Sequence, residues 1–255
     1  MMAMTEKRSN DIAHTFDVAR FAAERLAFTP DSRQAELLAT GGRNVILNCS
    51  RQWGKSTVTA AKAVHTAYFV EGSLILVAAP ALRQSAELVR KAAGFLRCLG
   101  IAPKGDGDNE VSLALPNRSR IVGLPSVEYS VRGFSSAALL LIDEAARVDE
   151  DLYRALRPVL AVSGGNVWMM STPFGKRGFF YETWTRGGPD WTRLRVPATE
   201  CPRIAPAFLQ AERKALGEPW FRQEYLCEFG DTQQAVFEEE AVRRMLRDDV
   251  EPLRF

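Results

Sequence analysis

The sequence has little cysteine and histidine and no long hydrophobic run. Its four cysteines lie far apart without a CxxC pair, and it has two histidines, which argues against a zinc site or a disulfide framework and fits a reducing cytosol. No apolar run approaches the roughly 20 residues of a membrane span, and the polar N-terminus lacks the apolar region of a signal peptide. The net charge of +2 is nearly neutral, so any contact with nucleic acid must come from local patches. These absences leave a globular protein of 255 residues with no membrane partner.

Short apolar runs alternate with helical patterns along the chain. Continuous apolar runs bounded by turn residues are typical of buried parallel strands, and they occupy residues 45–49, 74–78, 138–143 and 167–171. Helical patterns cover residues 55–70 and 82–99, and residues 105–125 read as a hairpin with a Pro-Asn turn. We therefore predict an α/β fold of the P-loop type (the RecA-like branch of the P-loop NTPases), with a mostly parallel central sheet flanked by helices on both faces.

The stretch CSRQWGKST lies where the first predicted strand would meet the following helix. Backbone N–H groups and a helix N-terminus form an anion site at such a junction, where Lys55 can reach the β- and γ-phosphates and Ser56 can bind Mg²⁺. Cys49 stands where the standard loop has glycine, which weakens the motif, and the tripeptide GKS alone is common. The candidate nucleotide-binding residues are Cys49, Ser50, Arg51, Gln52, Trp53, Gly54, Lys55, Ser56 and Thr57.

Independent support comes from the stretch ALLLIDEAARVD. An apolar strand that ends in Asp143 and Glu144 places two carboxylates at the edge of the sheet where open α/β sheets bind ligands. Asp143 would hold Mg²⁺ through water, as a Walker B aspartate does, and Glu144 would act as the general base for the attacking water. The alternative for this pair alone is a solvated helix start.

Two further features fit a nucleotide site. Gln34 follows a Thr-Pro pair, as in a motif that reads adenine, and its amide offers the donor and the acceptor that adenine requires; the alternative is a solvated glutamine near a helix start. Ser171 and Thr172, followed by Pro173, come directly after a buried strand, where a hydroxyl pair could sense the γ-phosphate. The alternative for that segment is a simple turn at the end of the strand.

Four segments together resemble the ATPase domain of tailed-phage terminase large subunits, the motors that package double-stranded DNA into procapsids. They are SRQWGKST, RGFSSAALLLIDEAARV, MMSTPFGKRG and FRQEYLCEF, and the resemblance runs from about Phe28 to Phe237. It implies that Arg51 is a loop arginine that contacts phosphate and that residues 171–173 couple hydrolysis to movement. It also implies that Arg132 is an arginine finger presented to a neighbouring subunit, although Arg132 could equally hold a loop by an ion pair.

The resemblance further implies the partners and the location. We expect ATP and Mg²⁺ as cofactors, double-stranded DNA held by its phosphates, self-association into a ring, and contact with a portal protein and a terminase small subunit. The place of action would be the host cytoplasm, at the viral procapsid. Candidate DNA contacts are the basic runs Lys176-Arg177 and Arg118 to Arg120, for which a solvated surface is the alternative.

The domain organisation follows from the same resemblance. We expect a helical, polar lead-in over residues 1–27, a P-loop ATPase core over 28–200, a helical segment over 201–237, and a linker-like tail over 238–255. In the family a nuclease domain follows that point, so we expect ATP hydrolysis and no DNA cleavage from this chain. The chain is either a domain cut from a longer protein or a stand-alone ATPase whose nuclease is a separate chain.

Three other functions remain open. A helicase-like ATPase would act on DNA or RNA, but it would need a second domain of the same type. A nucleotide-binding assembly protein without activity is disfavoured by the complete set of Lys55, Ser56, Asp143 and Glu144. A small-molecule kinase is disfavoured because Glu144 would activate water and because no cluster of arginines typical of a lid is present.

Overall fold

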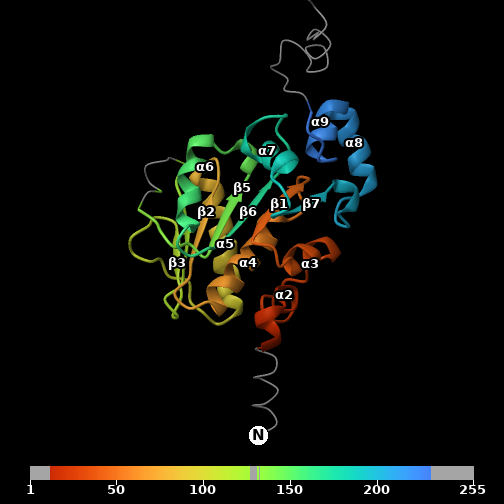
Figure 1. Cartoon of the computed structure of the whole chain (residues 1–255). Coiled ribbons are helices and arrows are strands. Elements are labelled where there is room, and N and C mark those ends of the chain that lie inside the picture. The colour runs from red at the N-terminus through yellow and green to blue at the C-terminus, as the bar shows by residue number, and fades with distance from the viewer. Residues whose placement is uncertain (1–11, 127–130, 132, 231–255) are drawn as a thin grey trace, which may run out of the picture.

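The centre of the protein is a seven-stranded sheet in the order β3-β4-β2-β5-β6-β1-β7 (Figure 1). This computed structural model describes residues 12–126, 131 and 133–230. All strand pairs are parallel except the antiparallel pair of β3 and β4. The strands are β1 (Asn44–Cys49), β2 (Leu74–Ala78), β3 (Ser112–Ala114), β4 (Arg120–Gly123), β5 (Leu139–Asp143), β6 (Asn166–Ser171) and β7 (Trp191–Val196).

Helices cover both faces of the sheet, as parallel sheets require. The first face packs against α2 (Val18–Arg25), α3 (Ser32–Ala39), α4 (Lys55–Phe69) and α5 (Leu82–Cys98). The second face packs against α6 (Glu150–Leu156), α7 (Gly178–Arg186) and the short 3₁₀ helices η2 (Ala145–Arg147) and η3 (Arg157–Leu160). After β7, η4 (Ala198–Glu200), α8 (Pro206–Leu216) and α9 (Glu218–Glu224) form a smaller cluster beside the edge of the sheet (Figure 1).

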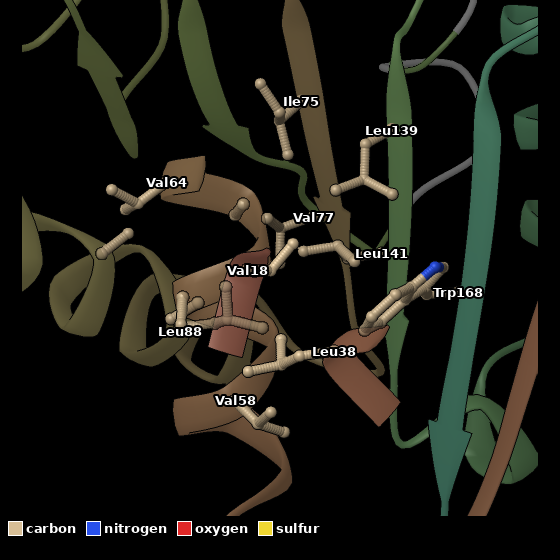
Figure 2. Close-up of a cluster of buried hydrophobic side chains, with 14 of the residues drawn as sticks. Val18, Leu38, Val58, Val64, Ile75, Val77, Leu88, Leu139, Leu141 and Trp168 are labelled. Carbon is tan, nitrogen blue, oxygen red and sulfur yellow. The ribbon is translucent and has the colours of Figure 1, made fainter. Parts of the chain in front are cut away.

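The two faces explain why the central strands read as continuous apolar runs. In β5, Leu139 and Leu141 pack into the core beneath α2 to α5, whereas Leu140 and Ile142 pack into the core on the other face. Figure 2 shows the first of these cores, where Leu141 and Trp168 lie among side chains from α4 and α5. Each such buried side chain contributes about 1.5–3 kcal/mol. Both faces of the sheet therefore stabilise the strands whose ends carry the candidate site.

The four predicted strands, the helices between them and the hairpin are confirmed. The sequence did not indicate β7, which pairs in parallel with β1 at the edge of the sheet. Its sequence, WTRLRV, alternates arginine with apolar residues, and only Leu194 and Val196 are buried. A strand buried on alternate residues and placed at an edge has no continuous apolar run to reveal it.

Within the described ranges 12–126, 131 and 133–230, no helix is both long enough and apolar enough to cross a membrane.

His65 on α4 makes the stability of the fold depend on pH. Burial lowers the pKa of His65 from 6.5 to about 4, although its Nε2 lies 2.9 Å from the backbone oxygen of His14. A histidine buried in the neutral form contributes stability above its unfolded pKa, and that stability is lost as the pH falls from 6.5 towards 4, because the unfolded chain then binds more protons.

We expect His65 to account for a loss of about 2 kcal/mol in the free energy of unfolding between pH 7 and pH 5. The measurement is urea unfolding of the wild type and of His65→Gln at both pH values. Because glutamine does not titrate, the free energy of unfolding of the variant should fall by about 2 kcal/mol less than that of the wild type between pH 7 and pH 5. Equal losses in the two proteins would show that His65 does not cause the acid sensitivity.

Candidate functional site

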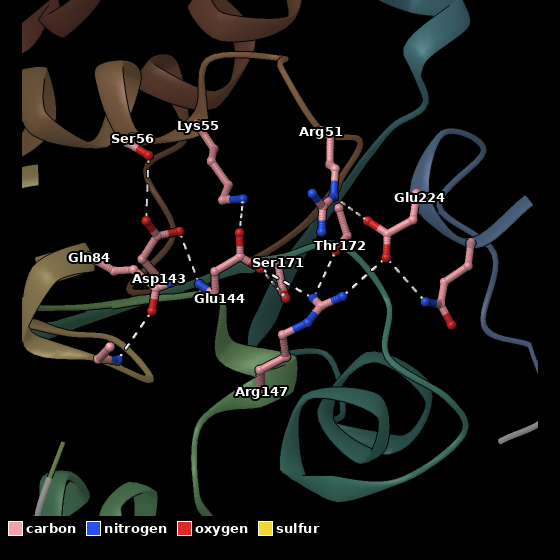
Figure 3. A network of polar contacts seen from close by, with 12 residues as sticks. Arg51, Lys55, Ser56, Gln84, Asp143, Glu144, Arg147, Ser171, Thr172 and Glu224 are labelled. Atoms are coloured by element: carbon pink, nitrogen blue, oxygen red, sulfur yellow. Dashed lines mark hydrogen bonds and ion pairs between the residues drawn. The ribbon is translucent and has the colours of Figure 1, made fainter. Parts of the chain in front are cut away.

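The carboxyl ends of three neighbouring strands meet at one edge of the sheet. β1 ends at Cys49, β5 at Asp143 and β6 at Ser171, and β6 lies between the other two strands. The register places Asp143 beside Met170 and Asn48 beside Ser171, so the three chain segments leave the sheet at nearly the same level. This edge is where open α/β sheets bind ligands, and the predicted site residues that follow the three strands meet there (Figure 3).

The loop between β1 and α4, the predicted phosphate-binding turn, has left-handed backbone at two positions. Gly54 is the N-cap of α4 with φ +95°, and Gln52 has φ +62°. These are the positions of the loop that need the left-handed region, which glycine adopts most readily. Cys49, by contrast, is the fully buried last residue of β1. The absence of the usual glycine at position 49 therefore does not strain this loop.

The side chains of Lys55 and Ser56 lie against those of Asp143 and Glu144, as the two predicted motifs require. Lys55 Nζ forms an ion pair with Glu144 Oε1, and Ser56 Oγ donates a hydrogen bond to Asp143 Oδ2 over 3.4 Å (Figure 3). Burial raises the pKa of Asp143, although Lys55 acts in the opposite direction. Burial also acts to lower the pKa of Lys55, but nearby negative charges, including Asp143 and Glu144, outweigh it, and the net shift is upwards. Lys55 is therefore held as a cation at the N-terminus of α4.

The oxygen atoms of Ser56 and Asp143 fit a magnesium ion. Mg²⁺ prefers oxygen ligands and is commonly held by one or two carboxylates together with nucleotide phosphates. The hydroxyl and the carboxylate lie side by side at the start of α4, where the phosphates of a bound nucleotide would lie. In the part of the chain that the structure describes, no group of three or more His, Cys, Asp or Glu side chains is placed to hold a metal ion.

Arg51 points away from the start of α4 and contacts α9. Its Nε donates to Glu224 Oε2 over 2.6 Å, and its backbone N–H donates to the backbone oxygen of Glu224 over 3.2 Å. The hydrogen bond that Arg51 donates to Glu224 raises the pKa of Arg51. The arginine is 61% exposed whereas the carboxylate is only 5% exposed, so Arg51 can turn away from Glu224 only if the buried carboxylate keeps another partner. Contact between Arg51 and phosphate stays a prediction.

Sequence reasoning did not single out Arg147 and Glu224, although both belong to this polar network. Arg147 Nη1 donates to Thr172 Oγ1 over 2.9 Å and lies 3.3 Å from Glu144 Oε2, and its Nη2 donates to Glu224 Oε1 over 3.1 Å (Figure 3). The spacing Glu-x-x-Arg from Glu144 to Arg147 is a signal that could have indicated the first contact. No local pattern indicates Glu224, because the two arginines that pair with it, Arg51 and Arg147, lie far away in the chain.

The hydroxyl pair of Ser171 and Thr172, at the end of β6, lies close to Glu144, the predicted general base. Ser171 Oγ lies 3.5 Å from Glu144 Oε2, and Thr172 reaches Glu144 through Arg147. Both residues are buried, so their hydroxyl groups depend on these partners. A change in the orientation of Glu144 therefore alters the hydrogen bonds of this segment.

Gln34 lies beneath the phosphate-binding turn. Its Nε2 donates to the backbone oxygen of Trp53 over 3.1 Å, and its Oε1 accepts from the backbone N–H of Asp31 over 3.0 Å as part of a capping box at the start of α3. Arg203 donates to the same Trp53 oxygen and forms an ion pair with Asp31 over 2.8 Å. The donor and the acceptor of the Gln34 amide thus both have hydrogen-bond partners within the protein.

The other predicted residues are distributed as follows. Ser50 and Trp53 are buried in the turn, and Ser50 Oγ and Trp53 Nε1 have no hydrogen-bond partner among the described residues. Thr57 N donates to the Gly54 oxygen in the first turn of α4. Arg132 lies outside the described residues.

The two basic runs lie at opposite edges of the sheet. Lys176 and Arg177 follow β6 on the edge that carries the site. The run from Arg118 to Arg120 ends at the first residue of β4. Arg120 is in register with Leu74, the first residue of β2, so this run lies at the other edge. There Arg118 pairs with Glu71.

This fold and site define a class. The P-loop nucleotide-binding α/β proteins share three features with this chain: a turn that ends in Gly54, a helix that begins with Lys55 and Ser56, and a strand that ends in Asp143 and is followed by Glu144.

The particular family follows from a comparison with protein families. The model described as "Terminase large subunit, T4likevirus-type, N-terminal" matches residues 46–244, which is more than half of the chain. The chain belongs to this family.

Solved structures with the same fold come from several phages. The Thermus phage P74-26 large terminase ATPase domain superposes with a TM-score of 0.73 at 21% identity, covering 83% of this chain and 98% of that one. The HK97 bacteriophage large terminase gives 0.70 at 16% identity, over 84% of this chain and 55% of that one. The large terminase of the thermophilic bacteriophage D6E in complex with ADP gives 0.65 at 13% identity, over 84% and 52%. The chain thus spans about half the length of the last two proteins.

Gln34→Ala tests what the buried amide does. Because both of its hydrogen bonds are made within the protein, we expect Gln34→Ala to weaken the binding of fluorescent ATP and GTP analogues by the same factor, on the order of tenfold. Titrations of wild type and variant with both analogues measure this. A loss confined to the adenine nucleotide would instead show that Gln34 reads the base.

Proposed function

We propose that this chain is the ATP-hydrolysing motor domain of a viral DNA-packaging terminase, which couples hydrolysis to the translocation of double-stranded DNA. The observation that carries the proposal is the convergence of Lys55 and Ser56 with Asp143 and Glu144 at one edge of the sheet. Membership of the terminase large-subunit family supports it. So does the D6E large terminase, which has been solved with ADP and with ATP-γ-S.

The arrangement suggests how the residues divide the work. Lys55 and the N-terminus of α4 bind the phosphates, and Ser56 with Asp143 would hold Mg²⁺, which neutralises charge on the phosphates. Glu144 orients the attacking water and accepts its proton. Since Lys55 pairs with Glu144 in this structure, a triphosphate that attracts Lys55 leaves the Glu144 carboxylate available to water. Arg51 adds positive charge once it turns towards the phosphates.

Assembly and DNA contact complete the proposed function. DNA is held by its phosphates on basic side chains, and we place Lys176 and Arg177 among them because they follow β6, whose hydroxyl pair touches Glu144 through Ser171. The distant run around Arg118 belongs to the opposite edge of the sheet and is the weaker candidate. Self-association into a ring, contact with a portal protein and a small subunit, and action at the procapsid in the host cytoplasm belong to the same proposal.

ATP hydrolysis with and without linear double-stranded DNA tests the motor. We expect DNA to stimulate the rate, and Glu144→Gln to lower kcat by about a hundredfold or more while nucleotide binding is retained. Glu87→Gln, which removes an exposed paired carboxylate on α5, is the matched control and should change nothing. The DNA recovered from the assay should be uncut. A rate that responds neither to DNA nor to Glu144→Gln contradicts the motor function, and cutting that persists in purified Glu144→Gln contradicts the absence of a nuclease.

Arg132→Ala tests the finger in trans. Because a finger supplied by a neighbour acts only at a subunit interface, the substitution should lower ATPase activity at concentrations where light scattering shows assembled protein. It should leave the activity of the dilute protein unchanged. Equal activity of wild type and variant in the assembled state would rule out the finger.

A further inference from the structure

Arg147 contacts the segments that surround the proposed catalytic carboxylate. Its guanidinium reaches Glu144 after β5, Thr172 after β6, and Glu224 on α9 (Figure 3). These three residues come from separate parts of the chain, and the side chain of Arg147 contacts all three. We propose that Arg147 is a positioning residue for hydrolysis, which fixes the Glu144 carboxylate and couples it to α9; this inference rests on the proposed function.

Local geometry explains why Arg147 can hold Glu144. Glu144 has φ +50° and is the N-cap of η2, and Arg147 is the last residue of that 3₁₀ helix. The backbone N–H of Arg147 donates to the backbone oxygen of Glu144 over 2.8 Å, which closes this turn. The turn therefore sets Arg147 directly against Glu144, on the side of the carboxylate opposite to the oxygen that pairs with Lys55.

The requirement for an arginine is specific. The planar guanidinium donates hydrogen bonds to several partners in fixed directions. A lysine ammonium, whose three donors rotate, cannot fix these directions. In addition, the guanidinium carbon lies over the ring of Phe174, 4.6 Å from its centroid, so a cation–π contact adds to the hydrogen bonds. Phe174 lies two residues after Thr172 in the chain. The segment that follows β6 therefore contacts Arg147 through both Thr172 and Phe174.

The link to α9 depends on the burial of Glu224. This carboxylate is 5% exposed and is shared by Arg147 and Arg51, one at each oxygen. A buried carboxylate needs its cations, since losing one leaves charge without compensation. When a triphosphate attracts Arg51, Arg147 becomes the principal partner of Glu224. The contact of Arg147 with Glu144 then changes together with the position of α9.

Steady-state hydrolysis of ATP by Arg147→Met and Arg147→Lys tests the positioning role. We expect Arg147→Met to lower kcat by about tenfold or more with KM within about twofold, and Arg147→Lys to restore only part of the rate because it restores the charge without the planar fork. Thermal unfolding confirms that each variant is folded at the assay temperature. A variant Arg147→Met with wild-type kcat overturns the positioning role.

Arg213→Met is the matched control. Arg213 lies 4.6 Å from the ring centroid of Phe221 and pairs with Glu218 over 3.1 Å, so it has the same kinds of contact as Arg147 but belongs to the α8–α9 cluster away from the site. Its removal breaks a contact at the N-terminus of α9 and leaves the partners of Glu144 and Glu224 in place. We expect kcat within about twofold of wild type.

Hydrogen exchange of α9 tests the coupling without requiring turnover. In the wild type, residues 218–229 should exchange at different rates with ADP and with ATP-γ-S. This difference should vanish in Arg147→Met and persist in Arg213→Met, where exchange rises in both states. If wild-type exchange is the same with both nucleotides, or if Arg147→Met keeps the difference, the coupling is wrong.

The two proposals fail in different ways. A wild type that does not hydrolyse ATP, or an active Glu144→Gln, overturns the proposed function. An active wild type, an inactive Glu144→Gln and an Arg147→Met indistinguishable from wild type overturn only the role of Arg147.

Discussion

The pairing of buried charge at the carboxyl edge of the sheet is the constraint on which the site depends. Ion pairs and hydrogen bonds join Lys55 to Glu144, Glu144 to Arg147, Arg147 to Glu224, and Glu224 to Arg51. With Asp143 included, these residues carry as many negative as positive charges when all are ionised. A nucleotide with its metal ion brings further negative charge, so the cations must exchange partners when it binds. Rearrangement is therefore built into the electrostatics of the site.

The sheet makes this pairing possible because it brings distant segments to one level. β1, β6 and β5 are consecutive neighbours in space, although some ninety residues separate the loop after β1 from the carboxylates after β5. Apolar side chains on both faces fix the strands, and the polar residues occupy only the strand ends. The middle of each of these strands therefore stabilises the fold, and its end carries the residues of the site. A polar residue at a strand end need not disturb the core.

Much of this could be predicted from sequence, because the signals are local. Continuous apolar runs indicated β1, β2, β5 and β6, and the motif residues around Lys55 and Asp143 were found from their position after such runs. Strand β7 escaped because it is an edge strand with exposed polar residues. The partner of Arg51 could not be predicted, since Glu224 lies 173 residues further along and its recognition requires the folded chain. The same holds for the internal hydrogen bonds of Gln34, which depend on how the loop approaches α3.

The position of Glu224 on α9 has a consequence for synthesis on the ribosome. The strands that carry the loop, the carboxylates and the hydroxyl pair emerge first, and α9 emerges last among these segments. Until then Arg51 and Arg147 lack the carboxylate that pairs with them in the folded protein, and the edge of the sheet carries an excess of positive charge. Because α9 is synthesised after the other segments of the site, its docking is the step that supplies Arg51 and Arg147 with their shared carboxylate.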